Sequence, residues 1–297
     1  AVLAHPLIDL AAIKAANFSA VVDGVNSTGG IALPPLLEAL GVKCFPLYCE
    51  PTGHFPHNPE PLKEHLGDLA EEVVRKKADL GIVVDPDVDR LAFMDEQGEM
   101  FGEEYTLVAC ADYVLSKNSG NTVSNLSSTR ALRDITEAAG GQYFASAVGE
   151  VNVVAKMKEK QAVIGGEGNG GIIDPNLHYG RDALVGVALF LSLLAQRKCS
   201  VSVLKASYPQ YYMSKGKIAL DASLDVDALL TQMEHNYQAD QPLTIDGLKI
   251  DFPEGWVHMR KSNTEPIIRV YAEAGTQKHA DALTQRFSSE LLAIAGQ

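Results

Sequence analysis

Short apolar runs alternate with amphipathic segments along the first third of the chain. Apolar, often β-branched residues dominate at 19–23, 44–48 and 80–84, and apolar residues recur at helical spacing over 31–40 and 62–74. Strands joined by helical crossovers form parallel sheets that are covered on both faces and bind ligands at the carboxyl ends of their strands. The pattern therefore predicts a β-α-β-α-β unit, and the polar residues directly after its strands are candidates for a site.

A second α/β pattern begins after a predicted hairpin over residues 91–101, which turns at Gln97-Gly98. Apolar runs again alternate with helical segments: strands are expected at 122–126, 143–148 and 162–164, and helices at 105–116, 130–139, 152–160 and 183–195.

From about residue 211 the order changes, because strands follow one another. They are expected at 216–220, as a hairpin over 243–252, and on both sides of 260–266, with helices at 226–237 and at the end of the chain. We predict an α/β protein with two mixed α/β domains, residues 1–101 and 102–208, and a smaller C-terminal α+β domain, residues 209–297.

The charge balance narrows the classes of partner. The 297 residues carry 25 Lys and Arg against 38 Asp and Glu, a formal net charge of −13. This balance argues against nucleic-acid and anionic-membrane binding, so an anionic ligand needs a local basic pocket. With 46% hydrophobic and 21% charged residues, the composition also excludes a disordered or fibrous chain.

Neither a membrane span nor an export signal is visible. The longest apolar stretch, residues 183–195, is shorter than the ~20 residues that a bilayer requires and is expected to be a buried helix. The chain does not begin with Met, so we expect a trimmed start. Its four cysteines show neither a CxxC pair nor zinc-finger spacing, which favours buried thiols in a reducing, cytoplasmic compartment.

Three carboxylates follow the third predicted strand. Asp85, Asp87 and Asp89 stand at alternate positions in DPDVDR, where a curled loop can aim all three at one hard cation, with Mg²⁺ as the first candidate. Arg90 adds a fixed cation that could reach a phosphate oxygen. The structural alternative is a solvated acidic turn. An EF-hand also fits the acidic spacing, but Arg90 stands where that loop needs Gly, and a strand rather than a helix precedes it.

Two further segments carry ligand chemistry. IGGEGNGG, residues 164–171, could bring its backbone close to a ligand while Glu167 and Asn169 bind hydroxyl groups, as a sugar requires. RKSNTEPIIR collects cations and small polar side chains between two strands, which predicts a phosphate cradle; the candidates are Arg260, Ser262, Asn263, Thr264 and Arg269. The alternatives are a flexible glycine turn and a plain exposed turn.

Together these segments resemble one family, the α-D-phosphohexomutases. DPDVDR is similar to the family's metal loop, GGEGNGG to its sugar loop, RKSNTEPIIR to its phosphate loop, and VVDGVNSTGG to a further family segment. The four matches come in family order and span nearly the whole chain.

The resemblance implies an activity and a set of roles. In this family a phosphoserine exchanges its phosphoryl group with a hexose phosphate, so that the 1-phosphate and 6-phosphate interconvert. Asp85, Asp87 and Asp89 would then hold Mg²⁺, and Arg90 would act as a catalytic residue that stabilises charge on the transferring group. Glu167 and Asn169 would bind the sugar. The residues of RKSNTEPIIR named above would bind the non-reacting phosphate.

The sequence departs from the family pattern at several places. The family's serine loop, of the kind Thr-x-Ser-His-Asn-Pro, belongs to a domain before all four segments, so we expect an N-terminal phosphoserine domain as a missing partner and no turnover by this chain alone. His57-Asn58-Pro59 only imitates that loop, because Phe55-Pro56 precedes it. Val88 replaces a usual Gly, and Gly171 stands where many members have a His.

The GEGNGG variant is associated with phosphoglucosamine mutases, which makes glucosamine phosphate the expected substrate. SNTEP, by contrast, is also similar to phosphomannomutase sequences. A phosphomannomutase/phosphoglucomutase and a non-catalytic sugar-phosphate-binding or calcium-binding protein are therefore the alternatives.

Overall fold

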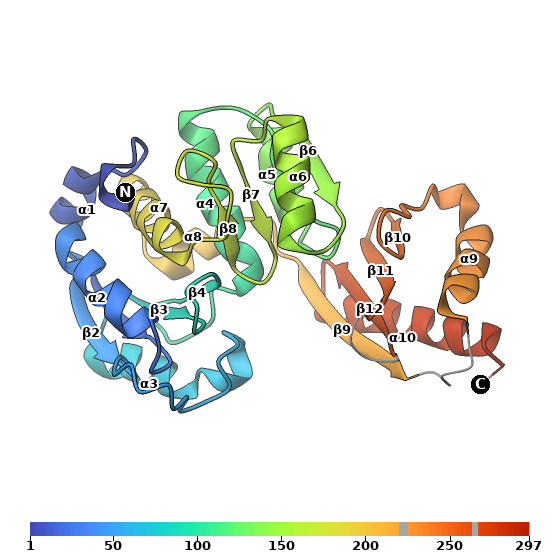
Figure 1. Cartoon of the computed structure of the whole chain (residues 1–297), viewed down its shortest axis with the longest axis horizontal. Coiled ribbons are helices and arrows are strands. Elements are labelled where there is room, and N and C mark those ends of the chain that lie inside the picture. Colours follow the sequence, from blue (N-terminus) through green and yellow to red (C-terminus); the bar gives the residue numbers. More distant parts are fainter. Residues whose placement is uncertain (220–224, 263–266, 297) are drawn as a thin grey trace. The chain divides into compact units, whose positions relative to one another are not determined.

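The structure is a computed structural model that describes residues 1–219, 225–262 and 267–296. The chain divides into two compact units (Figure 1). The first contains Ala1–Ala145 and Gly149–Pro209, and the second contains Ser146–Val148 and the chain from Gln210 onward.

The first sheet of unit 1 confirms the predicted β-α-β-α-β unit. Its strands β1 (Ser19–Asp23), β2 (Lys43–Leu47), β3 (Leu80–Val84) and β4 (Leu91–Met94) lie in the order β2-β1-β3-β4. The first three are parallel, and β4 is antiparallel to β3.

Two expectations for this region need correction. The helix expected over 62–74 is a short 3-10 helix, Lys63–His65, followed by α3 (Gly67–Lys76). The expected hairpin over 91–101 turns at Gly98, but its second strand is reduced to one bridge, Met94 to Met100.

Helices cover both faces of this sheet, as a parallel sheet requires. One face packs its buried residues Val21 and Val83 against Leu69 and Val73 of α3. Helices α1 (Leu10–Ala16), α2 (Gly29–Leu40) and α7 (Ala183–Arg197) lie together away from α3, with α2 on β1 and β2 and α7 on β4. Phe93 of β4 stacks on Phe190 of α7 with ring centroids 3.7 Å apart.

The second sheet of unit 1 has the order β6-β5-β7-β8. Its strands are β5 (Thr122–Asn125), β6 (Tyr143–Ser146), β7 (Ile164–Glu167) and β8 (Gly171–Ile173), and its helices are α4 (Glu103–Lys117), α5 (Ala131–Ala138) and α6 (Glu150–Lys160). The short helix α8 (Val201–Ala206) packs on α7. Because α4 and α7 pack on each other and on strands of both sheets, the two sheets form one body. The stretch read as a sugar loop is thus a hairpin, since β7 runs through Glu167 and pairs with β8.

Unit 2 is the predicted α+β fold. Four antiparallel strands have the order β10-β11-β12-β9, namely β10 (Leu248–Asp251), β11 (Gly255–Lys261), β12 (Ile267–Ala274) and β9 (Tyr212–Ala219). Helices α9 (Val226–Asn236) and α10 (Gln277–Ile294) pack against the sheet, with Ile218, Val257, Ile268 and Phe287 in the shared core. The hairpin expected over 243–252 is a single bridge from Leu243 to Lys249, and β10 pairs with β11 instead.

The apolar segment at 183–195 forms α7, and twelve of its residues are buried, as expected for a core helix. Within the described parts of the chain, every helix is too short or too polar to cross a bilayer. Of the four cysteines only Cys110 is buried, and the other three are partly exposed.

Candidate functional site

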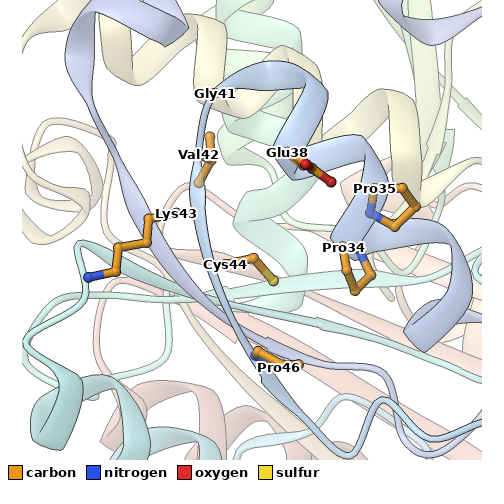
Figure 2. A pocket seen from close by; sticks show the side chains of 8 residues that line it. All are labelled: Pro34, Pro35, Glu38, Gly41, Val42, Lys43, Cys44 and Pro46. Atoms are coloured by element: carbon orange, nitrogen blue, oxygen red, sulfur yellow. The ribbon is translucent and has the colours of Figure 1, made fainter.

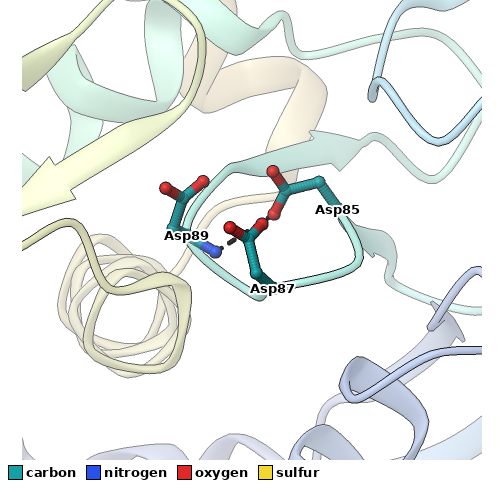
Figure 3. A group of neighbouring side chains, drawn as sticks. All are labelled: Asp85, Asp87 and Asp89. Carbon is teal, nitrogen blue, oxygen red and sulfur yellow. Dashed lines mark hydrogen bonds between the residues drawn. The ribbon is translucent and has the colours of Figure 1, made fainter. Parts of the chain in front are cut away.

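The three aspartates of DPDVDR come together at the carboxyl end of β3. Each of Asp85, Asp87 and Asp89 offers an oxygen, and these atoms all lie within 4.8 Å of one another. The buried Asp85 shapes the loop, because its Oδ1 accepts the backbone N–H groups of Asp89 and Arg90, both at 3.0 Å. Figure 3 shows the curled loop with the carboxylates of Asp85 and Asp87 close to each other and the backbone N–H of Asp89 directed to Asp85.

Neighbouring segments hold this loop from two directions. The carbonyl of Pro86 accepts the hydroxyl of Ser27, at 3.0 Å, and that of Thr28. The carbonyl of Val88 accepts the N–H of Ala183 at the start of α7, at 3.1 Å. The VNSTGG segment therefore serves as a support for the aspartate loop.

The electrostatics of the loop fit a divalent cation. Burial, opposed in part by the backbone hydrogen bond and reinforced by the carboxylates of Asp89 and Asp87, raises the pKa of Asp85 to about 7. Asp89 Oδ1 is buried and accepts no hydrogen bond from any described residue. A buried carboxylate oxygen without a donor, beside two further carboxylates, matches the hard oxygen ligands that Mg²⁺ takes.

The EF-hand alternative is wrong. The strand β3 precedes the loop, where an EF-hand has a helix. Glu96, the residue at the position of the last calcium ligand, instead accepts the N–H of Ser202 at 3.2 Å and its hydroxyl.

Arg90 lies where the sequence places it, on the loop itself. Its Nε is 3.6 Å from Asp85 Oδ2 and 4.0 Å from Asp89 Oδ1, and its Nη1 is 3.2 Å from Glu60 Oε1. The guanidinium thus borders the aspartates and retains partial solvent exposure.

Glu167 is more enclosed than a loop residue would be. It is 4% exposed, and its Oε1 accepts Asn125 Nδ2 at 2.8 Å and the N–H of Gly149 at 3.1 Å. Asn169 lies in the turn of the hairpin, where its Oδ1 accepts the N–H of Gly171 at 3.2 Å.

The glycines of the hairpin are packed against protein. A Cβ at Gly168 would lie 2.0 Å from the Glu104 carboxylate, and one at Gly170 would lie 2.2 Å from the carbonyl of Leu91. Their small size therefore allows close packing of the hairpin onto α4 and β4.

Sequence reasoning missed Arg181, which joins the two segments. Its guanidinium contacts Asp89 Oδ2, Glu167 Oε2 at 3.1 Å and Glu150 Oε2 at 3.2 Å. Burial disfavours its charge, but these three carboxylates outweigh that effect and raise the pKa of Arg181. No local pattern could reveal this, because Arg181 and Asp89 are 92 positions apart in the sequence.

The cations of the phosphate segment lie in strands of unit 2. Arg260 of β11 stands directly opposite Arg269 of β12, and Arg269 stands opposite Lys217 of β9. Like charges in direct register destabilise a sheet, so this row favours an anion beside it. Ser262 is buried, and its N–H donates to the carbonyl of Ile267 at 3.0 Å. Asn263 and Thr264 lie outside the described residues.

A surface pocket elsewhere in unit 1 does not coincide with this chemistry. Figure 2 shows it beside the edge strand β2, lined by Pro34, Pro35, Glu38, Gly41, Val42, Lys43, Cys44 and Pro46. Most of this lining lies where α2 ends and β2 begins, whereas the aspartate loop follows the carboxyl end of β3. Lys43 and Pro46 also protect β2 from pairing with another chain.

Comparisons with known proteins agree on one family. Sequence models of the phosphoglucomutase/phosphomannomutase family match in three blocks: alpha/beta/alpha domain II over residues 2–98, alpha/beta/alpha domain III over 102–212, and the C-terminal domain over 217–289.

Among similar proteins is a phosphoglucomutase/phosphomannomutase from Thermococcus kodakarensis, 36% identical over 92% of this chain and 60% of the relative. A phosphoglucosamine/phosphogalactosamine mutase from Sulfurisphaera tokodaii is 32% identical over 95% of this chain and 63% of the relative. A crystal structure of a family member from Burkholderia thailandensis superposes with a TM-score of 0.81 and 27% identity, covering 96% of this chain and 63% of that one. The chain thus spans about 60% of the length of the curated relatives it matches.

Proposed function

Because the chain belongs to the phosphoglucomutase/phosphomannomutase family of α-D-phosphohexomutases, we propose that it is the substrate- and metal-binding portion of a phosphohexose mutase, an isomerase that interconverts hexose 6-phosphate and 1-phosphate. One observation carries the proposal: in one compact unit, an aspartate loop suited to Mg²⁺ and a glutamate suited to sugar hydroxyls are joined by a single arginine.

Each residue has a chemical task in this proposal. Asp85, Asp87 and Asp89 would hold Mg²⁺, which when bound supplies positive charge to phosphoryl oxygens. Arg90 stabilises negative charge on the transferring phosphoryl group. Glu167 and Asn169 orient the sugar by accepting from its hydroxyls.

In unit 2, Arg260 and Arg269 bind a phosphate group, together with Ser262, Asn263 and Thr264 of the intervening segment. Guanidinium groups bind phosphate oxygens in pairs, and holding a non-reacting phosphate fixes the position of the reacting one. The Nε of Arg260 is buried and donates to no described residue, which supports an anionic ligand at this strand.

We propose glucosamine phosphate as the substrate, because the GEGNGG sequence of the hairpin resembles that of phosphoglucosamine mutases. The Sulfurisphaera relative is named for amino-sugar substrates. The name of the Thermococcus relative favours the second candidate, a phosphomannomutase/phosphoglucomutase. The ratio of kcat/KM values for glucosamine, mannose and glucose phosphates decides between them.

The phosphoserine is assigned to an N-terminal domain outside these 297 residues, and the cytoplasm is the proposed compartment. The purified chain should therefore bind glucosamine 6-phosphate but not convert it, whereas the protein that includes the serine domain should convert it, as followed by phosphorus NMR. Turnover by the chain alone would refute the assignment of the phosphoryl carrier. Absence of turnover by the longer protein on all three sugar phosphates would refute the proposed activity.

A further inference from the structure

Arg181 lies where the aspartate loop and the β7–β8 hairpin meet. We propose that Arg181 is a positioning residue, which orients the Asp89 carboxylate toward the metal position and the Glu167 carboxylate toward the sugar. The inference rests on the proposed function and adds a residue that acts through its neighbours.

The geometry of the guanidinium makes this role possible. Its three nitrogens contact three different carboxylates: Nη2 contacts Asp89, Nη1 contacts Glu167 at 3.1 Å, and Nε contacts Glu150 at 3.2 Å. The side chain is 15% exposed. A lysine ammonium is a compact point charge and lacks the planar fork that spans such separate partners.

The two carboxylate oxygens of Asp89 have different roles in this arrangement. Arg181 takes Oδ2, while Oδ1 is buried and accepts no hydrogen bond from any described residue. The contact therefore fixes the plane of the carboxylate and leaves Oδ1 as the oxygen for a cation held with Asp85 and Asp87. Partners of this kind orient metal ligands, and their loss typically weakens metal binding about 10- to 100-fold.

Most of the hydrogen-bond acceptor positions of Glu167 are occupied within the protein. A carboxylate has about four acceptor positions. Asn125 and the N–H of Gly149 occupy Oε1, and Arg181 occupies one position on Oε2. One acceptor position remains for a sugar hydroxyl, and Arg181 determines the direction in which it points.

The backbone before α7 supports Arg181. Asp182 caps α7 by accepting the N–H groups of Leu184 and Val185 at 2.7 and 3.1 Å, and its own N–H donates to Ile172 at 2.9 Å. These bonds fix the residue next to Arg181 on both the helix and strand β8.

Gly171 provides the space that Arg181 occupies. A Cβ at residue 171 would lie 2.3 Å from Arg181 Cδ, well inside contact distance. Any side chain larger than hydrogen at this position is therefore incompatible with Arg181 in its observed place. The position of the Arg181 side chain therefore depends on a glycine at residue 171.

Two charge-preserving variants of the 297-residue chain separate orientation from charge. Arg181→Lys removes the fork, and Gly171→Ala displaces the arginine without removing it. Calorimetric titration with Mg²⁺ should show binding about tenfold weaker in both variants than in the unchanged chain. The controls are Arg197→Lys, which alters an exposed pair with Asp112, and Gly67→Ala, where a Cβ meets no atom within 4 Å; both should match the unchanged chain.

Melting temperatures report structural damage separately from metal affinity. Unchanged Mg²⁺ affinity in Arg181→Lys or in Gly171→Ala would overturn the inference, because Mg²⁺ binding would then not depend on how the guanidinium orients the carboxylates. Tighter binding would overturn it as well, because Arg181 would be a competitor of the ion. If the unchanged chain does not bind Mg²⁺, it is the proposed metal site that fails, so the two failures are distinguishable.

Discussion

Val88 adopts an unfavourable backbone conformation in the aspartate loop. It stands at φ +62° in the middle of the aspartate loop, in the left-handed region that a β-branched residue rarely adopts. Its backbone carbonyl accepts the N–H of Ala183, so the loop is held in this conformation by α7. This is the position at which the sequence has Val88 in place of a glycine that is usual in the resembling family.

Replacing Val88 by glycine should therefore stabilise the protein. Relief of the left-handed strain is worth about 1–2 kcal/mol, and the extra freedom of an unfolded glycine costs about 0.5–1 kcal/mol, which leaves a net gain of about 1 kcal/mol. Scanning calorimetry should show the melting temperature of unit 1 higher by about 2–4 °C. The control Val74→Gly, at an exposed valine within α3, should lower it. A lower melting temperature for Val88→Gly would contradict the strain argument.

His57, which only imitates a serine loop, has a structural role. Its Nε2 lies 2.9 Å from Oδ2 of the buried Asp23. This hydrogen bond outweighs partial burial and raises the pKa of His57. The charged pair ties the segment between β2 and α3 to the carboxyl end of β1.

The stability that the His57–Asp23 pair contributes should decrease as the pH rises. Because the pKa is raised on folding, the extra stability is fully present below the unfolded value of about 6.5 and is lost as the pH rises through the folded pKa. His57→Asn should cost about 1.5–3 kcal/mol in acid and less at alkaline pH. The control His54→Asn, at an exposed histidine of the same segment, should show neither effect. An equal loss at both pH values, measured by urea unfolding, would exclude the charged pair.

At the scale of elements, the sheet of unit 2 aligns three cations. Strand register places Arg260, Arg269 and Lys217 opposite one another on β11, β12 and β9. Only the first two could be predicted from the sequence, because Lys217 is more than forty positions before them and reaches the row through strand pairing.

Lys217→Met should weaken phosphate binding modestly. Lys217 is exposed, so its contribution should be about 0.5–1 kcal/mol, or roughly two- to fivefold in affinity, and should fall with added salt. Titration with inorganic phosphate at low ionic strength measures it. Lys278→Met, on the exposed side of α10, should have no effect. Equal affinities of both variants would remove Lys217 from the site.

How far the sequence could predict the elements depended on their local chemistry. The β-branched runs at 19–23 and 80–84 gave strands with the observed ends, because their patterns are local. The run of glycines at 165–171 suggested a loop, whereas tertiary packing against Glu104 and Leu91 makes it a hairpin. A glycine alone cannot tell whether protein or ligand will approach it.

At the scale of the whole molecule, the packing of unit 1 explains why the aspartate loop and the β7–β8 hairpin keep fixed positions relative to each other. Helices α4 and α7 pack on strands of both sheets, so the ends of β3 and β7 are fixed relative to each other. The aspartate cluster was predictable because its three members lie within five residues. Arg181 was not, because its contacts exist only once α7 and the second sheet are packed.

Calorimetric titration of the chain with Mg²⁺ measures whether the aspartate loop is a Mg²⁺ site. We expect one bound ion in the unchanged chain and at least about tenfold weaker binding in Asp87→Asn, because the site loses a carboxylate charge. Asp240→Asn, an exposed position of unit 2, is the control and should bind as the unchanged chain does. Equal Mg²⁺ affinity in Asp87→Asn and the unchanged chain would show that the aspartate loop does not bind the ion.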